Sequence, residues 1–143
     1  MTTATPWAVV TGGGSGIGAA LATELARRGC RPILVGRRAA ALEATRADLA
    51  DPQAAICCPC DLASAAARGR LIDDVTAHIA ADDGELRCLV HNAGVGAPGP
   101  DFAGMAADDV EHALAVNAVA PLALTQGWLP LMRAGRLSAR ILL

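Results

Sequence analysis

The feature that most constrains this sequence is a cluster of glycines placed between a short apolar run and a segment with helical periodicity. Residues 7–10 are apolar, five glycines fall within residues 12–18, and apolar side chains then recur every four positions from Ile17 to Leu25. A short apolar run predicts a buried strand, and Arg28-Gly29 supplies the cation and the cap expected where a helix ends. The sequence therefore predicts a strand, a glycine turn and a helix in direct succession.

This unit of strand and helix repeats along the chain. Parallel pairing of successive strands requires crossover helices, which then cover both faces of the sheet. We predict a single α/β domain over residues 1–143, a doubly wound parallel sheet of the Rossmann type with three αβα layers, cut short at the start of its fifth strand. Further strands are expected at residues 32–35, 54–60, 88–90 and 140–143, and further helices at 39–50, 71–79 and 107–132.

Composition narrows the possible partners and chemistry. With 53% apolar residues, 18% charged residues and a formal charge of −2, the chain favours a packed core and offers no field for gathering nucleic acid. It contains no tyrosine and no lysine, so neither a phenol nor the lysine of a Walker-type phosphate loop is available. Five cysteines without a secretory leader favour a reduced, cytoplasmic setting over a disulfide framework.

Two segments invite other interpretations. Residues 112–132 carry no charged side chain and are long enough to cross a bilayer, but polar residues and two prolines interrupt them. We expect a buried helix of a soluble domain there, and no membrane partner. The sequence Cys57-Cys58-Pro59-Cys60 suggests a metal site, but no second ligand pair completes a tetrahedral set, so we expect small strand residues and no metal.

The glycine turn is suited to a diphosphate group. Without side chains, its backbone N–H groups and the positive end of the following helix can approach phosphate oxygens closely. The spacing of Gly14, Gly16 and Gly18 also fits methyl-donor-binding folds, but these favour an acidic residue after the first strand, where Thr11-Gly12 stands. We expect a dinucleotide cofactor to contact Thr11, Gly12, Gly14, Ser15, Gly16, Ile17 and Gly18.

The residues after the second strand decide which dinucleotide is favoured. A carboxylate there binds the free ribose diol of NAD and repels a 2′-phosphate. This chain has Arg37 and Arg38 instead, and each charge-assisted contact from a guanidinium to a phosphate contributes roughly 1.5–3 kcal/mol. We therefore expect NADP to be favoured over NAD, with Arg37 as the principal contact. The alternative is that both arginines form a solvated helix start.

Four motifs, in order, make the chain resemble the short-chain dehydrogenase/reductase family. The turn at residues 11–18 is followed by Asp61-Leu62 after the third strand, by His91-Asn92-Ala93-Gly94 after the fourth, and by Val116-Asn117 in the long helix. The family has Asn in the place of His91. The resemblance covers essentially the whole chain, because the motifs run from the first strand to the last helix.

The resemblance implies an oxidoreductase that transfers hydride between NADP(H) and a small carbonyl or alcohol substrate. It further implies that Asp61 and Leu62 contact the adenine ring of the cofactor and that Asn117 is a member of the catalytic set. The helix that contains Asn117 would form a homo-oligomer, as the matching helix does in the family. The remaining implied cofactor contacts are Asn92, Ala93 and Gly94.

The rest of the family's catalytic set is missing from this sequence. In the family, Ser, Tyr and Lys lie beyond the fifth strand, whereas Ser138 precedes that strand and tyrosine and lysine are absent. The tyrosine serves as the acid/base group, its pKa lowered by the lysine. We therefore expect the cofactor half of such an enzyme, unable alone to turn over carbonyl substrates. The alternative is a non-catalytic dinucleotide-binding or oligomerisation module.

Pro121 and His91 carry two smaller expectations. A continuous helix would bond the N–H of residue 121 to the carbonyl of Asn117, and proline has no N–H. We expect a local helix break there, which either frees the Asn117 carbonyl for the family's proton relay or merely separates two helices. His91 is expected to be a loop histidine bonded to backbone, or alternatively to line the cofactor pocket.

Overall fold

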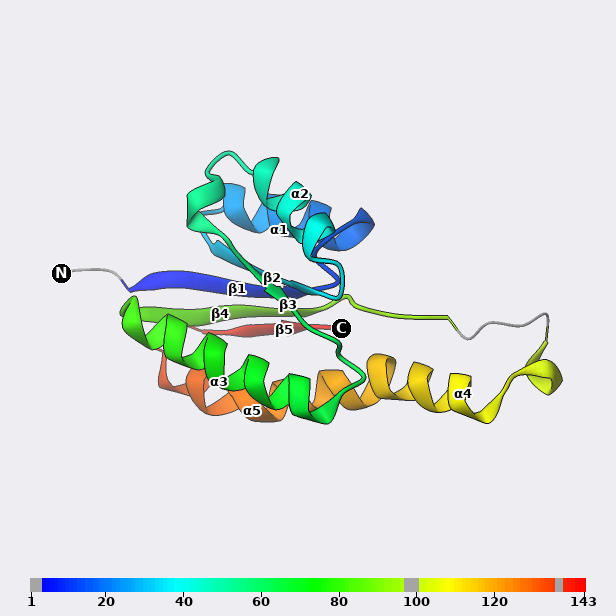
Figure 1. The fold of residues 1–143 in the computed structure, drawn as a ribbon. Coiled ribbons are helices and arrows are strands. Elements are labelled where there is room, and N and C mark those ends of the chain that lie inside the picture. The colour runs from blue at the N-terminus through cyan, green and yellow to red at the C-terminus, as the bar shows by residue number, and fades with distance from the viewer. Residues whose placement is uncertain (1–3, 97–100, 136–137) are drawn as a thin grey trace.

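Five parallel strands form one sheet with the order β3-β2-β1-β4-β5 in the computed structural model, which describes residues 4–96, 101–135 and 138–143 (Figure 1). The α/β class and the doubly wound sheet expected from the sequence are confirmed. The strands are β1 (Thr5–Thr11), β2 (Arg31–Gly36), β3 (Ile56–Pro59), β4 (Gly84–His91) and β5 (Arg140–Leu142). The helices are α1 (Gly16–Arg27), α2 (Ala39–Ala47), α3 (Ala65–Ala81), α4 (Ala107–Leu114) and α5 (Ala120–Ala134).

The helices lie in two layers, with α1 and α2 on one face of the sheet and α3 and α5 on the other (Figure 1). The chain runs outward from β1 to β3 and then returns to place β4 on the other side of β1. The connections after β1 and β4 therefore leave in opposite directions. A crevice forms outside the carboxyl ends of these two strands, which is where open α/β sheets bind ligands.

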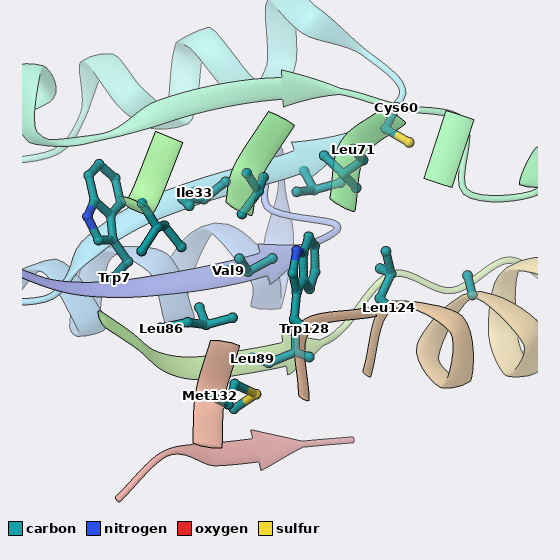
Figure 2. Packing of buried hydrophobic residues seen from close by; sticks show 14 of the residues in the cluster. Trp7, Val9, Ile33, Cys60, Leu71, Leu86, Leu89, Leu124, Trp128 and Met132 are labelled. Atoms are coloured by element: carbon teal, nitrogen blue, oxygen red, sulfur yellow. The ribbon is translucent and has the colours of Figure 1, made fainter. Parts of the chain in front are cut away.

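The face covered by α3 and α5 holds the larger part of the core. Figure 2 shows Trp7, Val9 and Ile33 of the sheet in one cluster with Leu71 of α3 and Trp128 of α5. Alternate residues of the same strands, among them Ala8, Val10 and Leu34, point to the α1 and α2 face. Strands buried on both faces explain the uninterrupted apolar runs in the sequence.

Several element boundaries differ from those expected. Helix α2 ends at Ala47 instead of residue 50, because Asp51 accepts a hydrogen bond from the N–H of Gln53 and starts a short 3₁₀ turn. Strand β3 consequently begins at Ile56 instead of residue 54. Strand β4 begins at Gly84, four residues before Cys88, because Leu86 is buried although the residues on either side of it are charged.

The long helical segment is not the single buried helix expected. Residues Ala115–Val119 form a π-helical turn between α4 and α5, in which the N–H of Ala120 bonds the carbonyl of Ala115. In place of the expected break near Asn117, the winding changes locally while the segment stays helical from Ala107 to Ala134. Helix α4 has no buried residue and extends past the carboxyl edge of the sheet (Figure 1). Only one stripe at four-residue spacing is buried: Val116, Ala120, Leu124, Trp128 and Met132.

Some apolar side chains are exposed on the outer side of α4 and α5. Leu114 is 56% exposed and Leu122 is 73% exposed. The whole segment Ala107–Ala134 is long and apolar enough to cross a membrane by length and composition. The expected absence of a membrane partner therefore stays a prediction.

Candidate functional site

A groove of about 250 Å³ lies at the carboxyl ends of β1, β2 and β4. A second hollow, of about 100 Å³, lies between the glycine turn and the start of α2. The two share Gly12, Ser15, Gly36 and Arg37, so they adjoin each other and are treated as one site. The residues expected from the sequence that line one or both are Gly12, Gly14, Ser15, Arg37, Arg38, Asp61, Leu62, Asn92, Ala93 and Gly94.

The glycine turn has no side chains at Gly12, Gly16 and Gly18, and the space around these positions differs. Gly12 and Gly16 have φ angles of +68° and +54°, a region that favours glycine because other residues clash with their own backbone there. A Cβ at Gly12 would lie 2.7 Å from Nδ2 of Asn92, whereas a Cβ at Gly16 would meet no atom within 4 Å. Gly18 lets α1 approach the turn, because a Cβ there would collide with the carbonyl oxygen of Gly12. Gly16 therefore faces open space, and Gly12 and Gly18 permit close packing.

The amino end of α1 presents backbone N–H groups to this space. Ser15 precedes the helix in an extended conformation, and its side chain makes no capping hydrogen bond within the described part of the chain. The first N–H groups of a helix have no partner inside it and carry its positive dipole end. Ile17, 73% exposed, stands beside them. These amides are placed to bind an anionic group.

Thr11 and Asn92 hold the two loops of the site together, and of the two only Asn92 lines the groove. The Thr11 hydroxyl donates to the carbonyl of Val90 and accepts from the N–H groups of Asn92 and Ala93, both at 3.1 Å. The Asn92 amide donates to the carbonyls of Thr11 and Gly12 at 3.1 and 3.3 Å. The glycine turn after β1 is thus fixed to the loop after β4.

The turn after β3 forms a third wall. The N–H of Cys60 donates to the carbonyl of Gly36 at 2.9 Å, and the Asp61 carboxylate accepts from the N–H of Ala63 at 3.0 Å. Asp61 is exposed, whereas Leu62 is buried and its carbonyl accepts from Nη1 of Arg68 at 2.6 Å. Arg68 is a residue that sequence reasoning missed, since nothing in its alanine-rich surroundings marks it.

Arg37 and Arg38 are exposed at the rim where β2 ends. Arg46, on the same side of the molecule, pairs with Glu43 at 2.7 Å. Arg37 and Arg38 form no such ion pair with any residue that the structure describes. Two unneutralised guanidinium groups therefore border the smaller hollow, a setting suited to a phosphate.

Comparison with known proteins decides the family. The family model for short chain dehydrogenases matches residues 6–142. The chain belongs to the short-chain dehydrogenase/reductase family. Human dehydrogenase/reductase SDR family member 13 is 36% identical over 130 residues, which are 89% of this chain and 32% of that protein. The chain spans about a third of the length of the curated relatives it matches.

Solved structures of short-chain dehydrogenases agree with the fold. A metagenomic short-chain oxidoreductase in complex with NADP superposes with a TM-score of 0.84 at 31% identity, over 98% of this chain and 62% of that one. The NADP complex of RhlG from Pseudomonas aeruginosa gives a TM-score of 0.80 at 29% identity, over 98% of this chain and 54% of that one. Each matched structure continues beyond the part that this chain covers.

The side chain of Asn117, the one residue of this chain expected to be catalytic, is engaged in hydrogen bonds. Oδ1 accepts from the N–H of Val95 at 2.9 Å, and Nδ2 donates to the carbonyl of Val95 at 2.8 Å. This paired contact ties the π-helical turn to the loop after β4, so the side chain positions the wall of the groove. A role in proton relay concerns the backbone carbonyl and stays a prediction.

His91 differs from both expectations. It is the last residue of β4, and its Nε2 lies 2.9 Å from the hydroxyl of Thr125 on α5. It is 9% exposed and is not among the residues that line the groove, and its ring makes no hydrogen bond to the backbone of the described residues. Burial lowers the pKa of its imidazole.

The cysteines of β3 form no metal centre in the part of the chain that the structure describes. No three His, Cys, Asp or Glu side chains there lie close enough to hold an ion. Burial raises the pKa of the Cys57 and Cys58 thiols to about 11, so both are protonated at neutral pH. Protonated thiols are poor ligands and poor nucleophiles, which agrees with a packing role.

Proposed function

We propose that this chain binds NADP(H) as the coenzyme-binding part of a cytoplasmic oxidoreductase that interconverts small carbonyl and alcohol substrates. The observation that carries the proposal is the site at the carboxyl ends of β1, β2 and β4, which combines bare backbone amides with unpaired arginines. The relatives whose structures contain NADP share this fold at 29–31% identity.

The residues present fit such a coenzyme. The open space at Gly16 and the uncapped amides of α1 suit a diphosphate, which needs close approach of the backbone. Asp61 and Leu62 would border the adenine, and Arg37 with Arg38 would bind the 2′-phosphate. The nicotinamide, when bound, supplies or accepts the hydride.

What this chain's own residues contribute is binding and orientation. The sequence has no tyrosine and no lysine to move a proton to or from a substrate oxygen. We therefore propose that these 143 residues hold the coenzyme without turning over a carbonyl substrate. A carbonyl-reductase rate well above that of the Gly16→Val variant, with NADPH and a panel of simple ketones, would contradict this. The non-catalytic dinucleotide-binding or oligomerisation module is the second candidate, and it shares the expectation that these 143 residues bind coenzyme without turnover.

Calorimetric titration of the chain with NADPH and NADH tests the coenzyme. We expect NADPH to bind at least tenfold more tightly, since one charge-assisted contact to the 2′-phosphate accounts for about that factor. Arg37→Ser should remove most of this preference and leave NADH binding unchanged. Arg46→Ser, which removes an arginine of the same layer that is paired with Glu43, is the matched control. Equal affinity of the wild-type chain for both coenzymes would overturn the choice of NADP.

A second copy of the chain is the proposed partner of the exposed side of α4 and α5. Leu114, Val119 and Leu122 are 47–73% exposed on this side. Apolar patches of this kind, at the surface of a helix, mark contact sites between proteins. Sedimentation should show a dimer that Leu122→Glu converts to a monomer, and a wild-type monomer at high concentration would exclude the contact.

A further inference from the structure

Arg68 places a buried cation next to the corner of the groove that Asp61 and Leu62 line. It lies in the first turn of α3, is 7% exposed, and donates from Nη1 to the Leu62 carbonyl at 2.6 Å. No carboxylate among residues 4–96, 101–135 and 138–143 forms an ion pair with it. Buried cations ordinarily have an anionic partner, so this arrangement needs a reason.

Packing alone does not supply the reason. An apolar side chain would fill the same volume at a lower free-energy cost, because a buried guanidinium loses hydration that a single carbonyl only partly replaces. Nor does the start of α3 need the charge, since Ser64 already caps the helix by accepting from the N–H of Ala67 at 3.2 Å. What the guanidinium adds is a short, charge-assisted hydrogen bond to one carbonyl of the turn.

That bond completes the attachment of the turn between β3 and α3. The Cys60 N–H fixes the start of the turn to Gly36 at the end of β2, and Arg68 fixes its far side to α3. Asp61 and Leu62, the two groove-lining residues, lie between these attachments. Loss of the Arg68 bond would free the turn without touching the amides of α1 or the rim arginines.

We propose that Arg68 is a positioning residue, which holds the Asp61–Leu62 turn in the shape that recognises the adenine base of the coenzyme. The proposal rests on the proposed function, since it assigns a role inside the same site. Its specific consequence is that Arg68 acts on recognition of the base and leaves binding of the phosphates unchanged.

The test compares NADPH with its hypoxanthine analogue, in which oxygen replaces the 6-amino group of the base. Both are titrated into the wild-type chain and into Arg68→Met, which keeps an apolar stem without a donor, and Arg68→Lys, which keeps a cationic donor group. Arg70→Met is the matched control: it makes the same charge change two residues further along α3, at an exposed position that lines a different hollow.

We expect the wild-type chain to prefer NADPH over the analogue. Arg68→Met should lower the affinity for NADPH about tenfold, the value of one charge-assisted hydrogen bond, and leave the analogue nearly unaffected. Arg68→Lys should restore NADPH binding to within about threefold, because a single N–H donor suffices for one carbonyl. Arg70→Met should match the wild type.

Three outcomes would overturn the role of Arg68 while leaving the proposed function intact: no preference for the base in the wild type, an Arg68→Met variant that binds like the wild type, or one that weakens both coenzymes equally. If the Arg68→Met variant does not fold, the Arg68→Lys variant is used in its place. Equal weakening of NADPH and its analogue in that variant would also overturn the role of Arg68. A wild-type chain that binds neither coenzyme overturns the role and the proposed function together.

Discussion

The two ends of the parallel sheet differ in how their polar groups are used. At the amino end, the Asp82 carboxylate accepts from Nε1 of Trp7 at 3.1 Å and from Arg31 at 2.8 Å, and the Arg31 guanidinium lies 4.2 Å from the centre of the Trp7 ring. The ring of His78 meets Trp7 edge-on at 4.9 Å. At the carboxyl end, the helix amides of α1 and the guanidinium groups of Arg37 and Arg38 have no such partners among the described residues.

This difference indicates that polar groups at the amino end stabilise the fold, whereas those at the carboxyl end are available for binding. Groups at the amino end satisfy one another and fill space, as Trp7 does with 0% exposure at one end of the core (Figure 2). Groups at the carboxyl end are held in place by bonds such as that from Asn92 to Thr11, but they keep their binding capacity for something outside the chain. Substitutions at the two ends should therefore affect different measurements.

The largest effect is expected at the amino end. Trp7→Leu removes a buried ring with its hydrogen bond and cation–π contact, and should lower the free energy of unfolding by about 3 kcal/mol or more. Urea unfolding measures this loss. The dissociation constant for NADPH, taken at a temperature where the variant is folded, should change less than twofold. A tenfold change in this dissociation constant would show that the amino end also affects coenzyme binding.

The two ends of α1 offer a matched pair of glycines. Gly16 and Gly29 both have positive φ angles, +54° and +86°, and a Cβ at either would meet no atom within 4 Å. Valine at either position should cost about 1–2 kcal/mol of stability, because a β-branched residue is strained there. Only Gly16→Val should also reduce NADPH affinity, by about 100-fold, since its side chain would occupy the space next to the helix amides. Equal binding by the two variants would show that the turn does not contact the coenzyme.

A smaller loss is expected when the Asp82 contact is weakened. Asp82→Asn should lower the free energy of unfolding by about 1 kcal/mol, since the ion pair with Arg31 is partly exposed to water. Glu24→Gln is the control. Hydrogen bonds from Arg27 and Arg28 lower the pKa of Glu24 to about 2, but water screens these surface pairs, so stability should not change measurably. An equal loss of stability in both variants would mean that the contacts of Asp82 with Trp7 and Arg31 contribute no more than those of Glu24.

The buried His91 should make the free energy of unfolding depend on pH. Its pKa in the folded protein lies below the ordinary value of 6.5 because of burial. As the pH falls below 6.5, the unfolded chain takes up the proton first, so the free energy of unfolding decreases until the folded pKa is passed. The slope should be at most about 1.4 kcal/mol per pH unit, measured by urea unfolding from pH 7.5 to 5. The His91→Asn variant should not lose this stability as the pH falls. Parallel curves of unfolding free energy against pH for the wild type and the variant would contradict the expectation.

Much of this architecture is readable from the sequence because single residues set it. The apolar run at residues 7–10 and the Gly12–Gly18 cluster specify a buried strand and a bare turn, and Gly29 ends α1 with the expected left-handed residue and its hydrogen bond from Cys30 to Leu25. Pro121, which lacks the N–H of an ordinary helix, indicated an irregularity near Asn117, which the structure shows as a π-helical turn and not as a break.

Specific side-chain contacts, most of them between distant segments, could not be read in this way. Asn117 bonds Val95, His91 bonds Thr125, and Arg68 reaches back to Leu62, and none of these pairings has a periodicity or a local spacing that reveals it. The exposure of α4 was also missed. Its apolar residues have the same pattern as a core helix, and only the position of α4 beyond the sheet edge leaves them uncovered.

The π-helical turn at Ala115–Val119 affects how α4 is rotated relative to α5. One extra residue in a turn changes the angular phase of everything that follows by about 100°. Deleting a single residue there would restore ordinary winding, and α4 would rotate by that angle if α5 kept its stripe on the sheet. Asn117 would then swing away from Val95, so the groove wall and the helix winding can change only together.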